Sequence, residues 1–149
     1  MKKSKNRQGF TLIELLIVVG LIGVLTFLGL PYYRPFLQYI SLKNDVWTVL
    51  SDLRGYRQLA IIEHVNYRVL FNVGSDSYTV EQRDAATDTF IQTVANVTLD
   101  SNLIQADDTT FRPMGDAVPA STIVLQGKNP ADKITITVYS TTGLARMRE

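Results

Sequence analysis

The sequence predicts an α+β protein in which one long amino-terminal helix packs against an antiparallel β-sheet body. Three observations support this fold class. An apolar run with no charged residue extends from Leu15 to Tyr33. Beyond Pro35, apolar residues recur at spacings of three and four, which is typical of an amphipathic helix. After Val65, short runs of β-forming residues alternate with Gly, Pro, Asn and Asp, which indicates strands joined by turns.

Composition and charge exclude several classes of protein. A chain of 149 residues with 46% hydrophobic and 19% charged residues suits one folded domain. The formal net charge of +1 conceals four basic residues within the first nine, so the remainder of the chain has a negative formal charge. A generally basic, nucleic-acid-binding body is therefore excluded. The sequence has no cysteine, which excludes disulfides and thiolate metal sites.

The first element is a membrane-spanning helix over residues 10–33. The 21 residues from Phe10 to Leu30 would form a helix of roughly 30 Å, enough to cross a bilayer core. By the positive-inside rule the basic residues 1–9 stay cytoplasmic, which predicts a single-pass protein with its carboxyl-terminal body on the periplasmic or outer face. No Ala-x-Ala site follows the apolar run, so cleavage behind the helix is not expected.

A glycine marks the boundary between the basic segment and the apolar run. The sequence Gly9-Phe10-Thr-Leu-Ile-Glu14, with its apolar continuation, resembles the type IV pilin family. That resemblance implies that residues 1–9 are a leader peptide, that prepilin peptidase cuts between Gly9 and Phe10, and that the new amino terminus, Phe10, is N-methylated. It also implies a place in the bacterial inner membrane with the body in the periplasm, and later in a pilus or pseudopilus filament.

Glu14 is a carboxylate inside the apolar run, where a charge is costly unless it has a partner. One interpretation is that it lies near the head groups and stays hydrated. The other is that the amine freed on Phe10 pairs with Glu14, on the same subunit or the next, and fixes the register of assembly. The family resemblance implies this assembly role for Glu14.

Glycines and a proline interrupt the apolar helix. Small residues allow close helix packing, and proline removes a backbone donor, so a packed face with a kink or melted stretch is predicted near Gly29 and Pro31. The alternative is a plain tilted anchor with incidental glycines, because both residue types are common in membrane helices.

The second half of the helix, residues 34–62, is amphipathic. Its apolar face is formed by Val46, Leu50, Leu53, Tyr56 and Ala60. The charged residues of this segment fall largely elsewhere on the helical wheel, namely Lys43, Asp45, Asp52 and Arg54. A continuous helix to Ile62 would be roughly 80 Å long, and its outer half needs a cover for the apolar face.

The body, residues 63–149, supplies that cover as antiparallel sheet. A hairpin is predicted from residues 67–73 and 77–83, which flank Gly74-Ser75-Asp76. Further strands are predicted at 90–94, 109–112, 122–125, 134–139 and 144–148.

The tail of the chain is similar to a narrower group. Phe111-Arg-Pro-Met-Gly115, the β-rich run that follows it, and a turn at Gly143 with a basic ending resemble the H-type minor pseudopilins of type II secretion and the FimT-like minor pilins (GspH/FimT type). The residues between Val65 and Asp108 are interpreted from pattern alone.

The sequence contains no constellation typical of an enzyme, cofactor site or metal centre, and we expect none of them. The single histidine, His64, lies where the long helix should end. Asp107, Asp108 and Asp132 could offer oxygens to calcium, but their spacing does not fit an EF-hand loop, and solvated turn carboxylates are the favoured interpretation.

The favoured function is a structural subunit, a minor pilin or pseudopilin of a type IV pilus or type II secretion pseudopilus. Its expected partners are other pilin or pseudopilin subunits, prepilin peptidase, the inner-membrane assembly platform and membrane lipid. The major subunit of such a filament stays open as an alternative.

A second alternative is a DNA-binding minor pilin for DNA uptake, which the FimT-like resemblance suggests. Arg146 and Arg148 alternate, so on a strand they would face one side and could contact phosphates. Leu144 and Ala145 stand where a DNA-binding relative would be expected to carry another arginine, and Glu149 offsets one charge. Two arginines on a solvated edge strand are the simpler interpretation.

Overall fold

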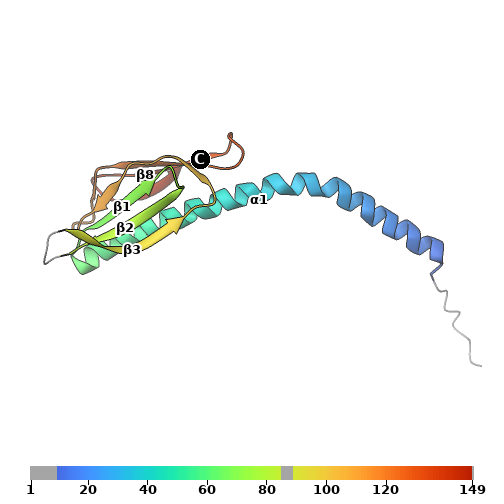
Figure 1. The fold of residues 1–149 in the computed structure, drawn as a ribbon, viewed down its shortest axis with the longest axis horizontal. Helices are drawn as coiled ribbons and strands as arrows, with labels where there is room; N and C mark the ends of the chain where they lie inside the picture. The colour runs from blue at the N-terminus through green and yellow to red at the C-terminus, as the bar shows by residue number, and fades with distance from the viewer. Residues whose placement is uncertain (1–9, 85–88, 149) are drawn as a thin grey trace, which may run out of the picture. The chain divides into compact units, whose positions relative to one another are not determined.

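The computed structural model describes residues 10–84 and 89–148, without the side chains of residues 30–32, 34, 35, 91 and 92. The chain forms two compact units, Met1–Phe36 and Leu37–Glu149. Over the described residues, the regular structure consists of one helix and two antiparallel sheets (Figure 1). The predicted α+β class, with a long helix and an antiparallel body, is confirmed.

The helix α1 extends from Leu12 to Glu63, one residue beyond the predicted end. It continues through Gly29 and Pro31, so the predicted melted stretch is not what the structure has, and the kink stays a prediction. His64 follows with a φ of 56°, the left-handed conformation that commonly ends helices. The helix therefore ends at the position of the single histidine, as the sequence predicted.

The body half of α1, Leu37–Glu63, buries one face. Leu42, Val46, Val49, Leu50 and Leu53 are almost completely buried, and their spacings of three and four keep them on one side of the helix. Tyr56, predicted on this face, is half-buried, and its ring centroid lies 5.7 Å from that of Tyr67. Most of the predicted apolar face is therefore the helix's contribution to the core.

The larger sheet has five antiparallel strands in the order β3-β2-β1-β5-β6. Its strands are β1 (Tyr67–Asn72), β2 (Ser77–Arg83), β3 (Phe90–Thr98), β5 (Thr109–Phe111) and β6 (Ala117–Val118). β1 and β2 form the predicted hairpin, in which Asn72 pairs with Ser77. In Figure 1, β1, β2 and β3 lie along the cyan-to-green part of α1.

The smaller sheet has the order β4-β7-β8-β9, again antiparallel. Its strands are β4 (Asn102–Gln105), β7 (Ser121–Gln126), β8 (Lys133–Val138) and β9 (Ala145–Arg148). Ile123, Leu125, Ile136 and Val138 are fully buried on one face of this sheet. They share a single hydrophobic core with the larger sheet and the body half of α1.

The predicted body differs from the structure in three respects. The strands form two sheets where one was expected, and β4 and β6 were not predicted. Both missed strands are short, with four residues in β4 and two in β6. β3 is longer than the predicted 90–94, and its pairing with β2 has register shifts after Val80 and after Gln82. Such bulges break the strict alternation that marks a strand in sequence.

Candidate functional site

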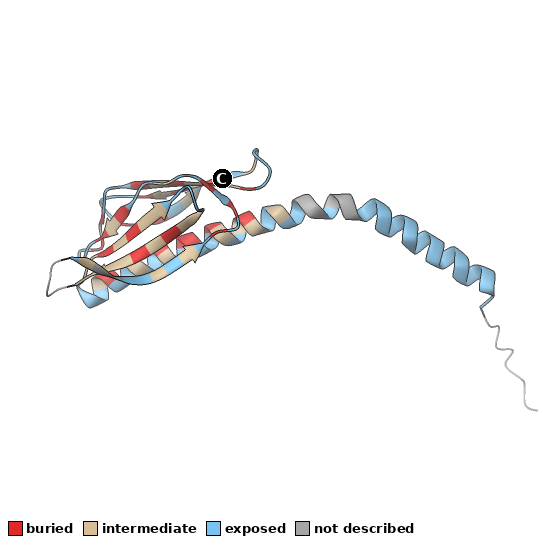
Figure 2. Ribbon diagram, viewed as in Figure 1, coloured by how far each residue is buried: buried red, intermediate tan, exposed pale blue. Residues whose placement is uncertain are grey.

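The apolar half of α1 is the first candidate site. Every side chain from Phe10 to Gly29 is exposed, as the pale blue helix in Figure 2 shows. By length and composition, Leu12–Gly29 could span a membrane, with a mean hydropathy of 2.6 and none of it buried within the chain. Because large exposed apolar surfaces mark sites of contact with membranes or other proteins, this helix is a candidate interaction site.

Glu14 takes part in the cap at the amino-terminal end of this helix. Its Oε2 accepts hydrogen bonds from the backbone N of Thr11 at 3.0 Å and from Thr11 Oγ1 at 3.1 Å. Thr11 Oγ1 in turn accepts from the backbone N of Glu14 at 3.3 Å. This reciprocal pair is a capping box, with threonine at the cap and glutamate three residues later. In the unassembled chain the carboxylate therefore has local donors.

The residues of the predicted cleavage site lie at the boundary of the described chain. Gly9 lies outside the described residues, and Phe10 is exposed ahead of the first helical turn. Cleavage between the two residues, N-methylation of Phe10 and pairing of its amine with Glu14 stay predictions. The sequence had not indicated the role of Thr11, although a Thr followed three residues later by Glu is a capping signature.

Polar contacts attach the body half of α1 to the sheets. Asp52 Oδ2 accepts a hydrogen bond from Tyr78 Oη at 2.6 Å, and Asp45 Oδ2 accepts one from the backbone N of Ser101 at 2.7 Å. Burial, reinforced by the hydrogen bond to Asp52, raises the pKa of Tyr78 well above its usual range. These aspartates were expected on the face away from the core, and they instead connect the helix to the body.

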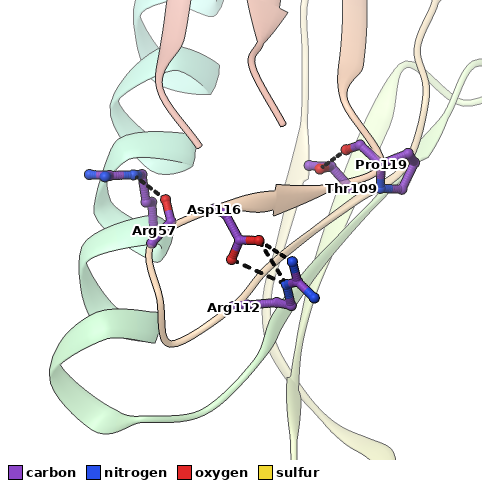
Figure 3. Close-up of polar contacts among 6 residues, drawn as sticks. Arg57, Thr109, Arg112, Asp116 and Pro119 are labelled. Carbon is purple, nitrogen blue, oxygen red and sulfur yellow. Dashed lines mark hydrogen bonds and ion pairs between the residues drawn. The ribbon is translucent and has the colours of Figure 1, made fainter. Parts of the chain in front are cut away.

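Arg57 holds two loops of the body against the helix. Its Nε lies 2.8 Å from both the Gly115 and the Thr142 carbonyl oxygens, so one N–H is shared between the two acceptors. Figure 3 shows the contact to the loop before β6, beside the Arg112–Asp116 ion pair that lies across the same loop. No local pattern marks Arg57 in the sequence, because both of its acceptors are distant in the chain.

Glycine is required at both loops that Arg57 contacts. Gly115 has a φ of 84° and Gly143 a φ of 60°, a backbone region that side chains rarely adopt. A Cβ on Gly143 would lie 2.4 Å from the Gly115 carbonyl oxygen, and one on Gly115 would lie 2.9 Å from Ile61 Cδ1. The two tail motifs singled out in the sequence, around Gly115 and Gly143, therefore meet against the helix and have a structural role.

The arginines of β9 lie on the outer face of the smaller sheet. Arg146 is opposite Thr137 and Arg148 is opposite Thr135 on β8, and both arginines are exposed. Their neighbour Ala145 points into the core. The strand thus presents its two cations on one side, next to a row of threonines.

Of the remaining candidates, Asp107 and Asp108 lie against backbone N–H groups. His64 is exposed at the end of α1. Asp108 Oδ1 accepts a hydrogen bond from the backbone N of Phe71 at 2.8 Å, and Asp107 Oδ2 lies 3.4 Å from the backbone N of Thr122. Over residues 10–84 and 89–148, no group of three or more His, Cys, Asp or Glu side chains could hold a metal ion.

Comparisons with known proteins agree with this division of the chain. Residues 4–30 match the family model described as the prokaryotic N-terminal methylation motif. "Prepilin peptidase-dependent protein D" of Escherichia coli (strain K12) is 36% identical over 59 residues, which is 40% of each chain. A "Fimbrial protein" of Pseudomonas aeruginosa is 39% identical over 59 residues, covering 40% of this chain and 38% of that protein. The chain thus matches about two fifths of the length of these curated relatives.

The body is similar in fold to a solved pseudopilin. The minor pseudopilin EpsH from the Type 2 Secretion System of Vibrio cholerae superposes with a TM-score of 0.60 at 18% identity, covering 72% of this chain and 96% of that one. A second structure of EpsH gives a TM-score of 0.56 at 15% identity, covering 74% and 95%. At this level of identity the match shows a shared fold. The chain thus has a prokaryotic N-terminal methylation motif and shares the fold of a solved minor pseudopilin.

Proposed function

We propose that the chain is a structural subunit, a minor pilin or pseudopilin, of a type IV pilus or type II secretion pseudopilus. In this proposal prepilin peptidase removes residues 1–9 and methylates Phe10, and the inner-membrane assembly platform then moves the subunit from the bilayer into the filament. The carrying observation is the exposed apolar helix Leu12–Gly29, which finds no partner in the described part of its own chain.

The orientation in the membrane follows from charge. The basic residues 1–9 stay on the cytoplasmic side, so the unit Leu37–Glu149 lies in the periplasm and the chain crosses the inner membrane once. This arrangement puts the sheets outside the bilayer, where their exposed polar edges can be hydrated.

Glu14 gives the assembly step its register. In the single chain its carboxylate binds Thr11, which satisfies it in part. After cleavage, the methylated amine of Phe10 is a cation within reach of a carboxylate on the same or a neighbouring subunit. In an apolar filament core such a pair is strongly favoured over either charge alone.

Photocrosslinking tests this function. A photoreactive amino acid at Leu25, exposed in the apolar half, is expected to capture another pilin or pseudopilin chain in cells that assemble filaments. The same label at Ser75, in the exposed β1–β2 turn, is the matched control and should give far less of this adduct.

The Glu14→Ala variant completes the test. It should insert in the membrane and be cleaved normally, yet lose most of the Leu25 adduct and most of its filament incorporation. Adducts at Leu25 that contain no pilin or pseudopilin chain, or normal filament incorporation of Glu14→Ala, would reject the proposal.

A second candidate function is binding of DNA through the outer face of the smaller sheet. The observation that favours it is the register of β9, which sets Arg146 and Arg148 side by side next to Thr137 and Thr135. Such a face can donate hydrogen bonds to phosphates and attract them electrostatically.

Gel shifts with the full chain in micelles test the second candidate. The Arg146→Ala/Arg148→Ala variant should bind more weakly and with a salt dependence shallower by about 2, one unit for each phosphate that an arginine no longer neutralises. Arg112→Ala removes an arginine that is already paired with Asp116 and should leave binding unchanged. Unaltered DNA mobility with the unsubstituted chain at low salt would eliminate this function.

A further inference from the structure

A pocket of about 170 Å³ opens at the end of the body where α1 enters it. Its walls are the part of α1 between Leu37 and Leu42, the turn after β3 at Asp100 and Ser101, and the loop after β7 at Gly127 and Lys128. All of these residues belong to the unit Leu37–Glu149. Neither the proposed assembly site nor the arginine face uses this pocket.

Ser101 is an unusual part of the wall. It is only 4% exposed, and its Oγ is buried without a hydrogen-bond partner among the residues that the structure describes. Its backbone N donates to Asp45 Oδ2 at 2.7 Å, which fixes the turn on the helix. Because a buried hydroxyl without a partner costs stability, an unpaired Oγ beside a pocket indicates that a ligand or water completes the site.

The pocket is preformed by contacts on both sides of Ser101. Asp76 holds the β3–β4 turn: its carbonyl oxygen accepts from Leu99 N at 2.8 Å and its Oδ1 accepts from Leu103 N at 2.7 Å. On the other side, Gly127 N donates to the Asp132 carbonyl oxygen at 2.9 Å. A preformed site loses little conformational entropy when it binds a ligand.

The lining is complementary to a zwitterionic ligand with an apolar extension. Lys128 supplies a cation, and Asp100 supplies an anion. Ser41 and Gln38 add neutral hydrogen-bonding groups, while the leucines of α1 are apolar. A phosphate next to Lys128, an ammonium group next to Asp100 and a glycerol backbone against the leucines would match the charged and apolar parts of the wall.

The position of the pocket in the chain identifies the source of such a ligand. Along the chain, Leu37 follows the apolar span, which ends at Gly29, by eight residues, so in the proposed membrane-anchored state the α1 wall of the pocket comes soon after the bilayer core. Lipid head groups occupy this zone at high local concentration.

We propose that this pocket binds the head group of a membrane phospholipid of the phosphatidylethanolamine class, with phosphate at Lys128 and ammonium at Asp100. Binding belongs to the membrane-anchored stage of the proposed function. A bound lipid retains the subunit in the bilayer until filament assembly extracts the subunit from the membrane.

Native mass spectrometry of the full chain tests the inference. Micelles that contain equal amounts of phosphatidylethanolamine and phosphatidylglycerol should yield a chain with one retained phosphatidylethanolamine. Lys128→Ala should lower that retention about tenfold, the effect of removing one charge-assisted hydrogen bond. Lys133→Ala removes a nearby exposed lysine that does not line the pocket and should change nothing.

Two further variants test the geometry. Asp100→Asn removes the partner of the ammonium group and should abolish the preference over phosphatidylglycerol. Ser41→Trp fills the pocket from the helix and should abolish retention, while its thermal unfolding verifies that the body is folded. Equal retention of the two lipids by the unsubstituted chain, or full retention by folded Ser41→Trp, would overturn the inference.

Competition identifies the source of the ligand. Soluble glycerophosphoethanolamine should displace the lipid, whereas inorganic phosphate at the same concentration should not. Equal displacement by phosphate would overturn the assignment to a phospholipid. Because these measurements use the unassembled chain, they can fail while the Leu25 crosslink to another pilin persists, and the reverse also holds.

Discussion

The two halves of α1 have the same backbone conformation and opposite surroundings. In the body half, one face is buried against two sheets, and Leu50 is only 2% exposed. In the apolar half, Leu25 is 68% exposed, and every side chain from Phe10 to Gly29 is open. The difference teaches that both halves form helix, but that only the body half has sheets of the same chain to bury its apolar surface.

The energetic consequence is different for the two halves. Full burial of a large apolar side chain is favourable by about 1.5–3 kcal/mol. In the body half this free energy stabilises the fold of the subunit itself. In the apolar half no such burial occurs within the described residues, and the proposed function assigns this free energy to the bilayer and then to neighbouring subunits.

Leucine truncations give the largest expected effect. Leu50→Ala should lower the free energy of unfolding of the body by about 2–5 kcal/mol, because it leaves a cavity in the core. Leu25→Ala should change it by less than about 0.5 kcal/mol. Urea unfolding of the full chain in micelles, followed by circular dichroism, measures both. Similar losses for the two variants would contradict the division of α1.

Glycine substitutions extend the comparison. Gly143→Ala should destabilise the body by roughly 2–4 kcal/mol, because its left-handed φ disfavours a side chain and the new Cβ would meet the Gly115 carbonyl oxygen. Gly23→Ala should leave this free energy unchanged, since a Cβ at that position would have no other atom within 4 Å. If helix packing in the filament uses that glycine, Gly23→Ala should lower filament incorporation alone.

Alkaline pH should affect the body through Tyr78. Its pKa is raised in the folded chain by burial and by the hydrogen bond to Asp52. The stabilisation from the neutral phenol is therefore complete below the unfolded pKa of about 10 and declines as pH rises above it. Thermal unfolding at several pH values should show this decline, and Tyr78→Phe should make it shallower. An identical alkaline decline in Tyr78→Phe would reject the role of this tyrosine.

The smallest effect is expected at the capping box. Thr11→Val removes the hydroxyl that binds Glu14 and should weaken the first turn of α1 by about 1 kcal/mol. Amide exchange in micelles should therefore accelerate about fivefold over residues 12–16, with no change in the body. Thr26→Val is the control, since its hydroxyl binds a carbonyl oxygen within the helix and caps no terminus. Unchanged exchange in Thr11→Val would show that the cap contributes nothing.

The sequence was informative wherever a pattern is local. The apolar run, the amphipathic face and the hairpin around Gly74 are each read from neighbouring residues, and the structure has all three. The His64 helix end was predicted to within one residue. These features depend on periodicity and turn chemistry, which short stretches of sequence carry in full.

Contacts between distant residues could not be predicted. Asp45 and Asp52 resemble solvated charges on the helical wheel, and only the folded chain shows that they bind Ser101 and Tyr78. Arg57 joins loops 58 and 85 residues away in the chain. The split into two sheets likewise depends on which distant strands pair, and no local signal specifies such pairing.

The amino terminus of the mature protein tests the central claim most directly, namely that the exposed apolar helix serves first as membrane anchor and then as filament contact. Intact-mass and peptide mass spectrometry of the protein isolated from native membranes and filaments measures it. Our account predicts a chain that begins at Phe10 and carries one methyl group on its amine. A mature chain that still begins at Met1 would contradict the account.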